Sequence, residues 1–245
     1  MGRIYIGLSG YSYKAWQGPD RFYPADIKPA GFLRYYASRY STVELDGIWY
    51  RLPTDQAVRA WVEQAPSDFV YAPKAHRQIT HVRRLKLEGL STLQAMLERL
   101  APLHEAGRLG PILLQLPPNF KRDDARLATF LEALPTSHRW TFEFRHDSWH
   151  AEPVEQLLRH HGVAWAEVDT DEHEAELRNT AGFRYARLRK SAYEATDLAR
   201  WAERFKEASG RGQDYYVYCK HEDEGSPWLW ADSLLDQLGL RREPE

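Results

Sequence analysis

The alternation of apolar and charged residues is clearest in the stretch W-T-F-E-F-R-H-D-S-W at residues 140–149. Phe142 and Phe144 alternate with Glu143 and Arg145, which is the two-residue period of a β-strand. The phenylalanines therefore share one face and the charged side chains share the other. Because charged groups rarely face inward without a partner or a purpose, the pattern suits a barrel strand around an inner site. A half-exposed antiparallel strand with solvated charges fits it equally well.

Seven further segments have the pattern of strands, and helical patterns separate nearly all of them. Strands are predicted at residues 4–9, 42–46, 69–74, 111–116, 163–169, 183–189 and 215–220. Helices are predicted at residues 31–40, 54–64, 91–106, 123–134, 153–161, 197–208 and 227–238. The polar segment 170–180 lacks the apolar spacing of a helix, so we expect a loop or a single turn there.

This alternation of strands and helices predicts parallel strands joined by right-handed crossovers. Eight such units predict an α/β fold, a single (β/α)8 TIM-type barrel domain over residues 1–245, with the sixth crossover helix reduced or missing. A doubly wound open sheet is the alternative. The fingerprint G-x-G-x-x-G does not follow the first strand, and the phosphate-binding loop G-x-x-x-x-G-K-[ST] is absent as well.

Composition and charge indicate which partners and which cellular compartment the sequence favours. The net charge is −2, so no global basic field attracts nucleic acid, and such a role would need a local patch. Cys219 is the only cysteine, which excludes an internal disulfide and favours a reducing compartment. The sequence has no signal-peptide pattern at its start and no apolar run long enough to span a bilayer. We therefore expect a cytoplasmic protein without a membrane role.

Barrel enzymes build their sites at the C-terminal ends of the strands, and this chain places charged residues there. The expected acid–base groups are Glu143, Glu44 and His146. The expected substrate-binding residues are Arg145, Arg187, Lys74, Tyr11, Tyr50, Gln115 and Asp169. Carboxylates and cations in a confined site shift one another's pKa values, and guanidinium forks fit phosphate or carboxylate groups. A structural ion-pair network that fills the barrel is the competing interpretation.

A metal site is not predicted. Glu44, Glu143, Asp169 and His221 come from separate strands, as metal ligands do in some barrels. However, the chain lacks H-E-x-x-H and cysteine-rich spacings, and the neighbouring Arg and Lys residues oppose a dication. The sequence identifies no cofactor.

Short motifs run along nearly the whole chain. They are I-G-L-S-G-Y-S-Y (6–13), F-Y-P (22–24), Y-Y-A (35–37), T-V-E (42–44), Y-R-L-P (50–53), I-T-H (79–81), Q-L-P-P (115–118), E-F-R-H with S-W (143–149), and T-A (180–181) with R-L (187–188). Together they resemble the YecE-like family, a domain of unknown function (domain of unknown function 72). The resemblance implies a (β/α)8 barrel, distantly similar to the xylose-isomerase and apurinic-endonuclease barrels, and no agreed activity. The chain departs from the family pattern at Asp46-Gly47, at Arg189-Lys190 and at Lys220-His221-Glu222.

We expect a member of this family to bind a small phosphate- or carboxylate-bearing ligand at the C-terminal strand ends, with acid–base catalysis of the lyase, isomerase or hydrolase type. One alternative is a nucleic-acid-binding or repair-type barrel. It would use the basic segment 76–86 with Trp16, Trp49 and Tyr50 in neighbouring loops. A non-catalytic interaction scaffold is a third hypothesis. The sequence leaves the oligomeric state open.

Overall fold

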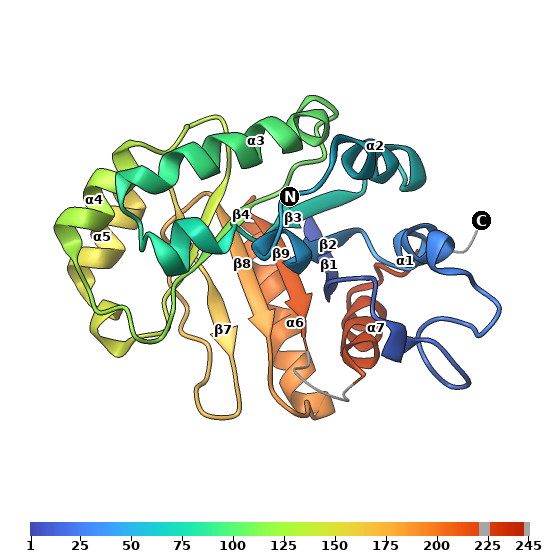
Figure 1. Ribbon diagram of the computed structural model, residues 1–245. Helices are drawn as coiled ribbons and strands as arrows, with labels where there is room; N and C mark the ends of the chain where they lie inside the picture. Colours follow the sequence, from blue (N-terminus) through green and yellow to red (C-terminus); the bar gives the residue numbers. More distant parts are fainter. Residues whose placement is uncertain (221–225, 243–245) are drawn as a thin grey trace.

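Parallel strands form the centre of the computed structural model, which describes residues 1–220 and 226–242 (Figure 1). One sheet has six strands in the order β3-β2-β1-β9-β8-β7, and a second has three in the order β4-β5-β6. The strands of the larger sheet are β1 (Ile4–Ser9), β2 (Thr42–Leu45), β3 (Val70–Pro73), β7 (Glu167–Asp169), β8 (Phe183–Leu188) and β9 (Asp214–Cys219). Those of the smaller sheet are β4 (Ile112–Gln115), β5 (Trp140–Glu143) and β6 (Ala164–Trp165).

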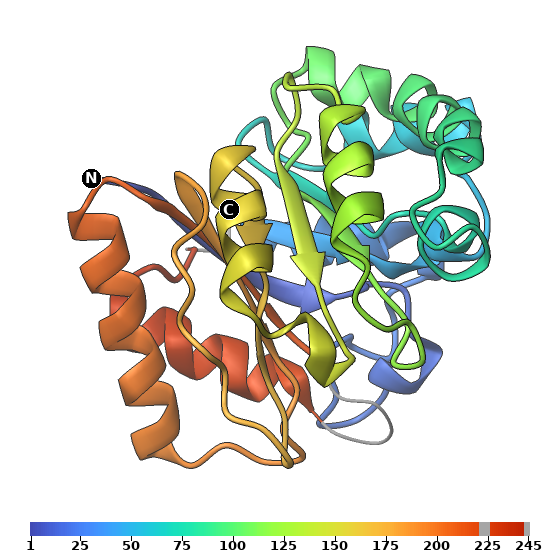
Figure 2. The ribbon, with the colours of Figure 1, turned by 90° about the vertical axis from the view of Figure 1, so that its left-hand side faces the viewer.

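Seven α-helices lie where the sequence predicts helices. They are α1 (Phe32–Arg39), α2 (Asp55–Gln64), α3 (Leu90–Glu105), α4 (Asp124–Glu132), α5 (Glu152–His160), α6 (Ala195–Gly210) and α7 (Pro227–Leu238). Orange α6 and red α7 lie on one side of the strands, and green α3 and α4 lie on the other (Figure 2). Thr54 caps α2 as expected, because its Oγ1 accepts a hydrogen bond from Ala57 N at 3.2 Å. Among the described residues, no helix is long and apolar enough to cross a membrane.

Shorter helical turns connect several of these elements. Short 3₁₀ turns are η1 (Lys14–Trp16), η2 (Pro29–Gly31), η3 (Asp46–Trp49), η5 (Leu87–Gly89) and η6 (Asp147–Trp149), and η4 (Gln78–Val82) is a π turn. Residues 170–182, between β7 and β8, contain no helix. The prediction that the sixth crossover lacks a full helix is therefore confirmed.

The strand predicted at 163–169 is divided between the two sheets. β6 pairs with β5, whereas β7 pairs with β8, and Ala166 between them donates from its backbone N to Phe142 O at 2.8 Å. At the other edge, isolated parallel bridges join Tyr71 to Leu109 and Lys74 to Leu113. The α/β fold with parallel strands is confirmed. The closed eight-stranded barrel is not, because the strand ladders form two sheets.

The strands have two buried faces of different composition. One face packs against the helices in a large apolar core. The other holds a smaller cluster that includes Tyr5, Leu113, Tyr185, Tyr216 and Tyr218. We call this second face the inner face. Further along the same strands, toward their C-terminal ends, charged residues replace the aromatic ones, and these positions form the candidate site.

Candidate functional site

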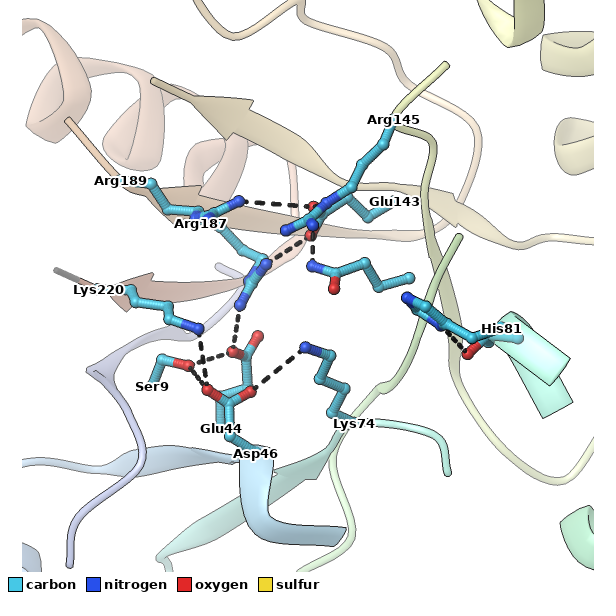
Figure 3. Close-up of polar contacts among 12 residues, drawn as sticks. Ser9, Glu44, Asp46, Lys74, His81, Glu143, Arg145, Arg187, Arg189 and Lys220 are labelled. Carbon is cyan, nitrogen blue, oxygen red and sulfur yellow. Dashed lines mark hydrogen bonds and ion pairs between the residues drawn. The ribbon is translucent and has the colours of Figure 1, made fainter. Parts of the chain in front are cut away.

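Ten polar side chains meet at the C-terminal ends of the strands, and we call this group the charged centre. Its members are Ser9, Glu44, Asp46, Lys74, Gln115, Glu143, Arg145, Arg187, Arg189 and Lys220 (Figure 3). Parallel pairing aligns Ser9 with Glu44 and Gln115 with Glu143. Because side chains alternate along a strand, these residues continue the inner face above its aromatic cluster.

Arg187 joins two strands across this centre. Its Nη1 donates to Glu143 Oε2 at 2.6 Å and its Nη2 donates to Glu44 Oε1 at 2.8 Å, and its side chain is fully buried. Burial alone would lower the pKa of Arg187, but Glu44 and Glu143 raise it well above its ordinary value. Within the part of the chain that the structure describes, its Nε has no hydrogen-bond partner. Arg187 is therefore a permanent buried cation between two carboxylates.

Glu143 is surrounded by donors. Its Oε1 accepts from Gln115 Nε2 at 2.8 Å and from Arg145 Nε at 2.9 Å, and Arg189 Nη1 lies 3.8 Å away. Burial alone would raise the pKa of Glu143, but Arg187, Arg145 and Arg189 lower it well below its ordinary value. Glu143 is thus a carboxylate at neutral pH, which can accept a proton but has none to give.

Ser9 links the other two carboxylates. Its Oγ lies 2.5 Å from Glu44 Oε1 and 2.7 Å from Asp46 Oδ2, and one hydroxyl hydrogen serves only one of them at a time. Tyr185 donates to Glu44 Oε2 at 2.6 Å, and Lys220 donates to Asp46 Oδ2 at 3.2 Å. Burial opposes ionisation of Asp46, but Lys220 and Lys74 lower its pKa to about 2.

Lys74 and Asp46 face each other without a hydrogen bond. Lys74 Nζ lies 3.9 Å from Asp46 Oδ1, and Oδ1 has no hydrogen-bond partner among residues 1–220 and 226–242. Lys74 also lies 5.3 Å from the centre of the Trp49 ring. Burial lowers the pKa of Lys74 to about 8, while Asp46 acts in the opposite direction. The pair is close enough for electrostatic attraction but too far apart for a direct bond.

His81 lies at the edge of the charged centre (Figure 3). Its Nδ1 is 2.9 Å from Thr80 Oγ1, and its ring meets Trp49 edge to face. Burial, followed by the charges of Lys74 and Arg145, lowers the pKa of His81 to about 4. It is therefore neutral at physiological pH.

Four predicted site residues lie outside the charged centre: Asp169, His146, Tyr11 and Tyr50. Asp169 accepts from Trp201 Nε1 at 3.3 Å, on the side of β7 that faces α6. The reason is register: Val168 pairs with Arg187, so Asp169 falls on the opposite face, paired with Leu188 of the helix-facing core. The expectation that Asp169 joins the other site residues is therefore corrected.

His146 lies just beyond β5 and serves a local turn. Its Nδ1 accepts from Ser148 N at 3.1 Å and caps η6. No hydrogen bond joins it to Glu143 in the described part of the chain. A ring nitrogen engaged in capping suits a structural role better than the acid–base role predicted from the sequence.

The two predicted tyrosines have different surroundings. Tyr11 accepts a hydrogen bond from Trp61 Nε1 at 3.0 Å and lines a cavity of about 340 Å³. Tyr13, Asp46 and Ile48 line the same cavity, which therefore adjoins the charged centre. Tyr50 is 70 % exposed and rests edge to face on Trp49.

Sequence reasoning places Ser9, Asp46, Arg189 and Lys220 at strand ends, and the two-residue period puts Asp46 on one strand face with Glu44, but none of the four is assigned a role in the site. Tyr185 is not among the candidates. It precedes Arg187 by two positions, so the same period could have found it. The described residues contain no group of three or more His, Cys, Asp or Glu side chains with the geometry of a metal site. His221 and Glu222 lie outside the described residues.

Comparison with known proteins finds relatives that are described as UPF0759 proteins. The chain is 32% identical over 162 residues to the UPF0759 protein YecE of Escherichia coli (strain K12), and 29% identical over 161 residues to the UPF0759 protein YunF of Bacillus subtilis (strain 168). These matches cover 65% and 63% of the chain but only 55% of each relative, so they span about half the length of those proteins.

Solved structures extend the likeness to the whole chain. A DUF72 family protein (TM1631) from Thermotoga maritima superposes with a TM-score of 0.79 at 26% identity, covering 97% of this chain and 99% of that one. A DUF72 family protein (EF0366) from Enterococcus faecalis gives 0.75 at 20% identity, covering 98% and 99%, and shares the fold. The sequence model of the family described as "Protein of unknown function DUF72" matches residues 5–245, and the chain therefore belongs to the DUF72 family.

Proposed function

We propose that the charged centre binds a small anion that carries a phosphate or carboxylate group. The observation that carries this proposal is a pair of cations with unused donors. Lys74 Nζ makes no hydrogen bond, and Arg145 uses only its Nε, toward Glu143, among the partners that the described residues offer. A guanidinium fork and an ammonium are the groups that proteins use to hold such anions.

The same centre offers groups for proton transfer. Asp46 Oδ1 is a buried carboxylate oxygen without a hydrogen bond in the described structure, and Lys74 Nζ lies 3.9 Å from it. The lowered pKa values of Asp46 and Glu143 make both carboxylates weak bases that favour positive charge beside them. Lys74, with a pKa of about 8, is the group of this centre best matched to proton transfer near neutral pH. These groups support acid–base chemistry on the bound anion, of the kind used by lyases, isomerases and hydrolases.

We propose further that the two sheets act together as one (β/α)8 barrel domain over residues 1–245. Two observations support closure. The segment 164–169 belongs to both sheets, and bridges connect β3 to β4 at the opposite edge. A ring of strands would explain why Glu44 of β2 and Glu143 of β5 both reach Arg187 of β8. The single buried cysteine is consistent with a cytoplasmic location for this domain.

A thermal-shift screen tests the proposed ligand class. Phosphorylated metabolites and small carboxylates should raise the Tm of the wild type, and neutral analogues of the same size should not. Arg145→Gln should weaken the response, whereas Arg59→Gln, which changes an exposed arginine on α2, should leave it intact. Absence of stabilisation by every anion would reject the proposal and favour the non-catalytic scaffold.

Nucleic-acid binding through segment 76–86 remains a second proposal. The supporting observation is an exposed aromatic and basic surface: Tyr50 is 70 % exposed beside Trp49, and the Arg77 guanidinium lies 5.6 Å from the Trp49 ring centre. Exposed rings and guanidinium groups are what single-stranded nucleic acids stack on. Binding should weaken strongly with added salt, since phosphate contacts release counterions.

A further inference from the structure

The amine of Lys74 is unusually placed for a buried charge. Lys74 is 8 % exposed, and its nearest carboxylate oxygen, Asp46 Oδ1, lies 3.9 Å away. Its only other close partner in the described structure is the face of Trp49. Buried polar groups almost always have hydrogen-bond partners, so an amine and a carboxylate oxygen that face each other without one need an explanation.

The charges around Lys74 keep its amine reactive. Asp46, Glu44 and Glu143 favour the ammonium, while burial and Arg187 oppose it, and the balance brings the pKa to about 8. Neutral His81 lies at the edge of the same charged centre. At pH 7 roughly a tenth of such an amine is neutral, compared with roughly one part in 2,500 for an ordinary lysine with a pKa of about 10.4. A neutral amine is the nucleophilic form.

We propose that Lys74 forms a Schiff base with the carbonyl group of an anionic aldehyde or ketone. This inference rests on the proposed function, because it names the substrate class of the same anion site. In its geometry, a buried amine without a hydrogen bond faces a carboxylate oxygen that also lacks one. Arg145, which has unused donors, lies in the same charged centre, where it contacts Glu143.

Lys74, Asp46 and the carbonyl compound together supply every proton that Schiff-base formation needs. The Lys74 ammonium first passes one proton to Asp46, and the neutral nitrogen then bonds to the carbonyl carbon. Asp46 gives that proton to the carbonyl oxygen, which becomes a hydroxyl group, and then accepts a second proton from the nitrogen. Asp46 then returns its proton to the oxygen, which leaves as water while the nitrogen forms the C=N bond. Overall, one ammonium and one carbonyl compound give one iminium and one water.

The surroundings limit which carbonyl compound fits. The two terminal nitrogens of Arg145 provide a fork for a carboxylate or phosphate. The cavity that adjoins the centre through Asp46 is lined by apolar and aromatic groups, Tyr11, Ile48 and Trp61 among them. The substrate class is therefore a short oxo acid or a phosphorylated aldehyde or ketone, with its carbon skeleton toward that cavity.

Borohydride trapping tests the inference on the wild-type protein. Pyruvate, glyoxylate and glyceraldehyde 3-phosphate are each incubated with the protein and sodium cyanoborohydride, and adducts are located by intact mass and peptide mapping. We expect at least one of the three to give a single adduct at Lys74, formed at least ten times faster than adducts at exposed lysines. Its rate should rise with pH to a plateau above about pH 8.

Variants and controls separate the outcomes. Lys74→Met should remove the adduct, and Lys86→Met, which changes an exposed lysine, should retain it. If Lys74→Met does not fold, peptide mapping of the wild type still decides. Adducts spread evenly over exposed lysines, or no adduct at Lys74, overturn the Schiff base. If Lys74 forms no adduct but anions still stabilise the protein, anion binding stands and only the Schiff base is rejected. If the adduct and the stabilisation by anions are both missing, both proposals are rejected.

Discussion

Strand β8 contributes an arginine to each of two buried carboxylate–guanidinium clusters, Arg187 on its inner face and Arg184 on its helix-facing side. In the charged centre, Glu143 accepts from Arg187, Gln115 and Arg145. In what we call the outer cluster, Glu167 accepts from Arg184 Nε at 2.6 Å and from Tyr215 Oη at 2.5 Å, on the face toward the helices. Both carboxylates are 1 % exposed. Burial of an ion pair therefore does not by itself mark a site.

The two clusters differ in how completely their charges are compensated. Burial raises the pKa of Glu167 more than Arg184 lowers it, so Glu167 keeps a raised pKa. Three arginines reverse that balance at Glu143 and lower its pKa. The outer cluster is closed, with one cation, one carboxylate and one hydroxyl. In the charged centre, Lys74 and Arg145 keep N–H donors without hydrogen-bond partners in the described structure. An anionic ligand can accept hydrogen bonds from these donors.

The largest expected difference is between Arg187→Met and Arg184→Met. Removing Arg187 leaves both Glu44 and Glu143 buried without their shared cation, which should destabilise the protein by about 3–5 kcal/mol. Arg184→Met should destabilise it less, because Glu167 can take up a proton more easily and keeps Tyr215 as a partner. Urea unfolding at pH 7 measures both, and equal losses would mean that the two clusters do not differ.

Neutralising each carboxylate should give the next largest difference in stability between the two clusters. Glu143→Gln keeps the shape but removes an ionised group with several charged donors, so we expect a loss of about 2 kcal/mol at pH 7. Glu167→Gln should change stability by less than about 1 kcal/mol, because burial already disfavours the charged form of Glu167 and raises its pKa. A larger loss for Glu167→Gln would reverse the comparison.

The pH dependence of these two variants has opposite signs. The folded pKa of Glu143 is below its unfolded value, so its contribution is present at neutral pH and is lost as the pH falls through the folded pKa. The folded pKa of Glu167 is above its unfolded value, so its charged form is unfavourable at neutral pH and the protonated form stabilises the fold as the pH falls. Between pH 7 and pH 3, the cost of Glu143→Gln should therefore shrink and that of Glu167→Gln should grow.

Lys74→Met tests whether the charged centre is unfavourable for stability. The folded pKa of Lys74, about 8, is below its unfolded value, so its ammonium destabilises the fold at pH 7. We expect the variant to be more stable than the wild type by about 1–2 kcal/mol at pH 7, and the gain to shrink between about pH 8 and pH 10.4. Unfolding at pH 7 and pH 10 measures this gain. A destabilised variant would show that Lys74 supports the fold, contrary to the pattern of active sites.

The smallest effect is expected outside both clusters. Charge reversal at Arg83 and Arg84, in the basic segment 76–86, should leave the thermal response to phosphate compounds unchanged, because these residues are not part of the charged centre. If single-stranded nucleic acid binds, the same change should weaken it across all sequences. Fluorescence anisotropy at two salt concentrations measures this, with Arg59→Glu as the control. A lost response to phosphate would move the anion site toward this segment.

The sequence by itself determined the elements and the faces of most site residues. The two-residue period found the inward-facing positions Glu143 and Arg187. Apolar spacing found the seven α-helices of the described residues and indicated that the sixth crossover has no full helix. These features are local, because each depends only on neighbours a few positions away along the chain. The family resemblance, now confirmed, likewise depends on short motifs along the chain.

Tertiary structure decided what depends on distant segments. Asp169 ends a strand just as Glu143 does, but pairing register turns it toward α6. His146 follows a strand, and a local turn engages its ring. The division of one strand between two sheets and the meeting of Lys74 with Asp46 arise in the same way. Such contacts join residues far apart in sequence, and the pattern of a single segment does not contain them, because register is fixed only when whole strands pack together.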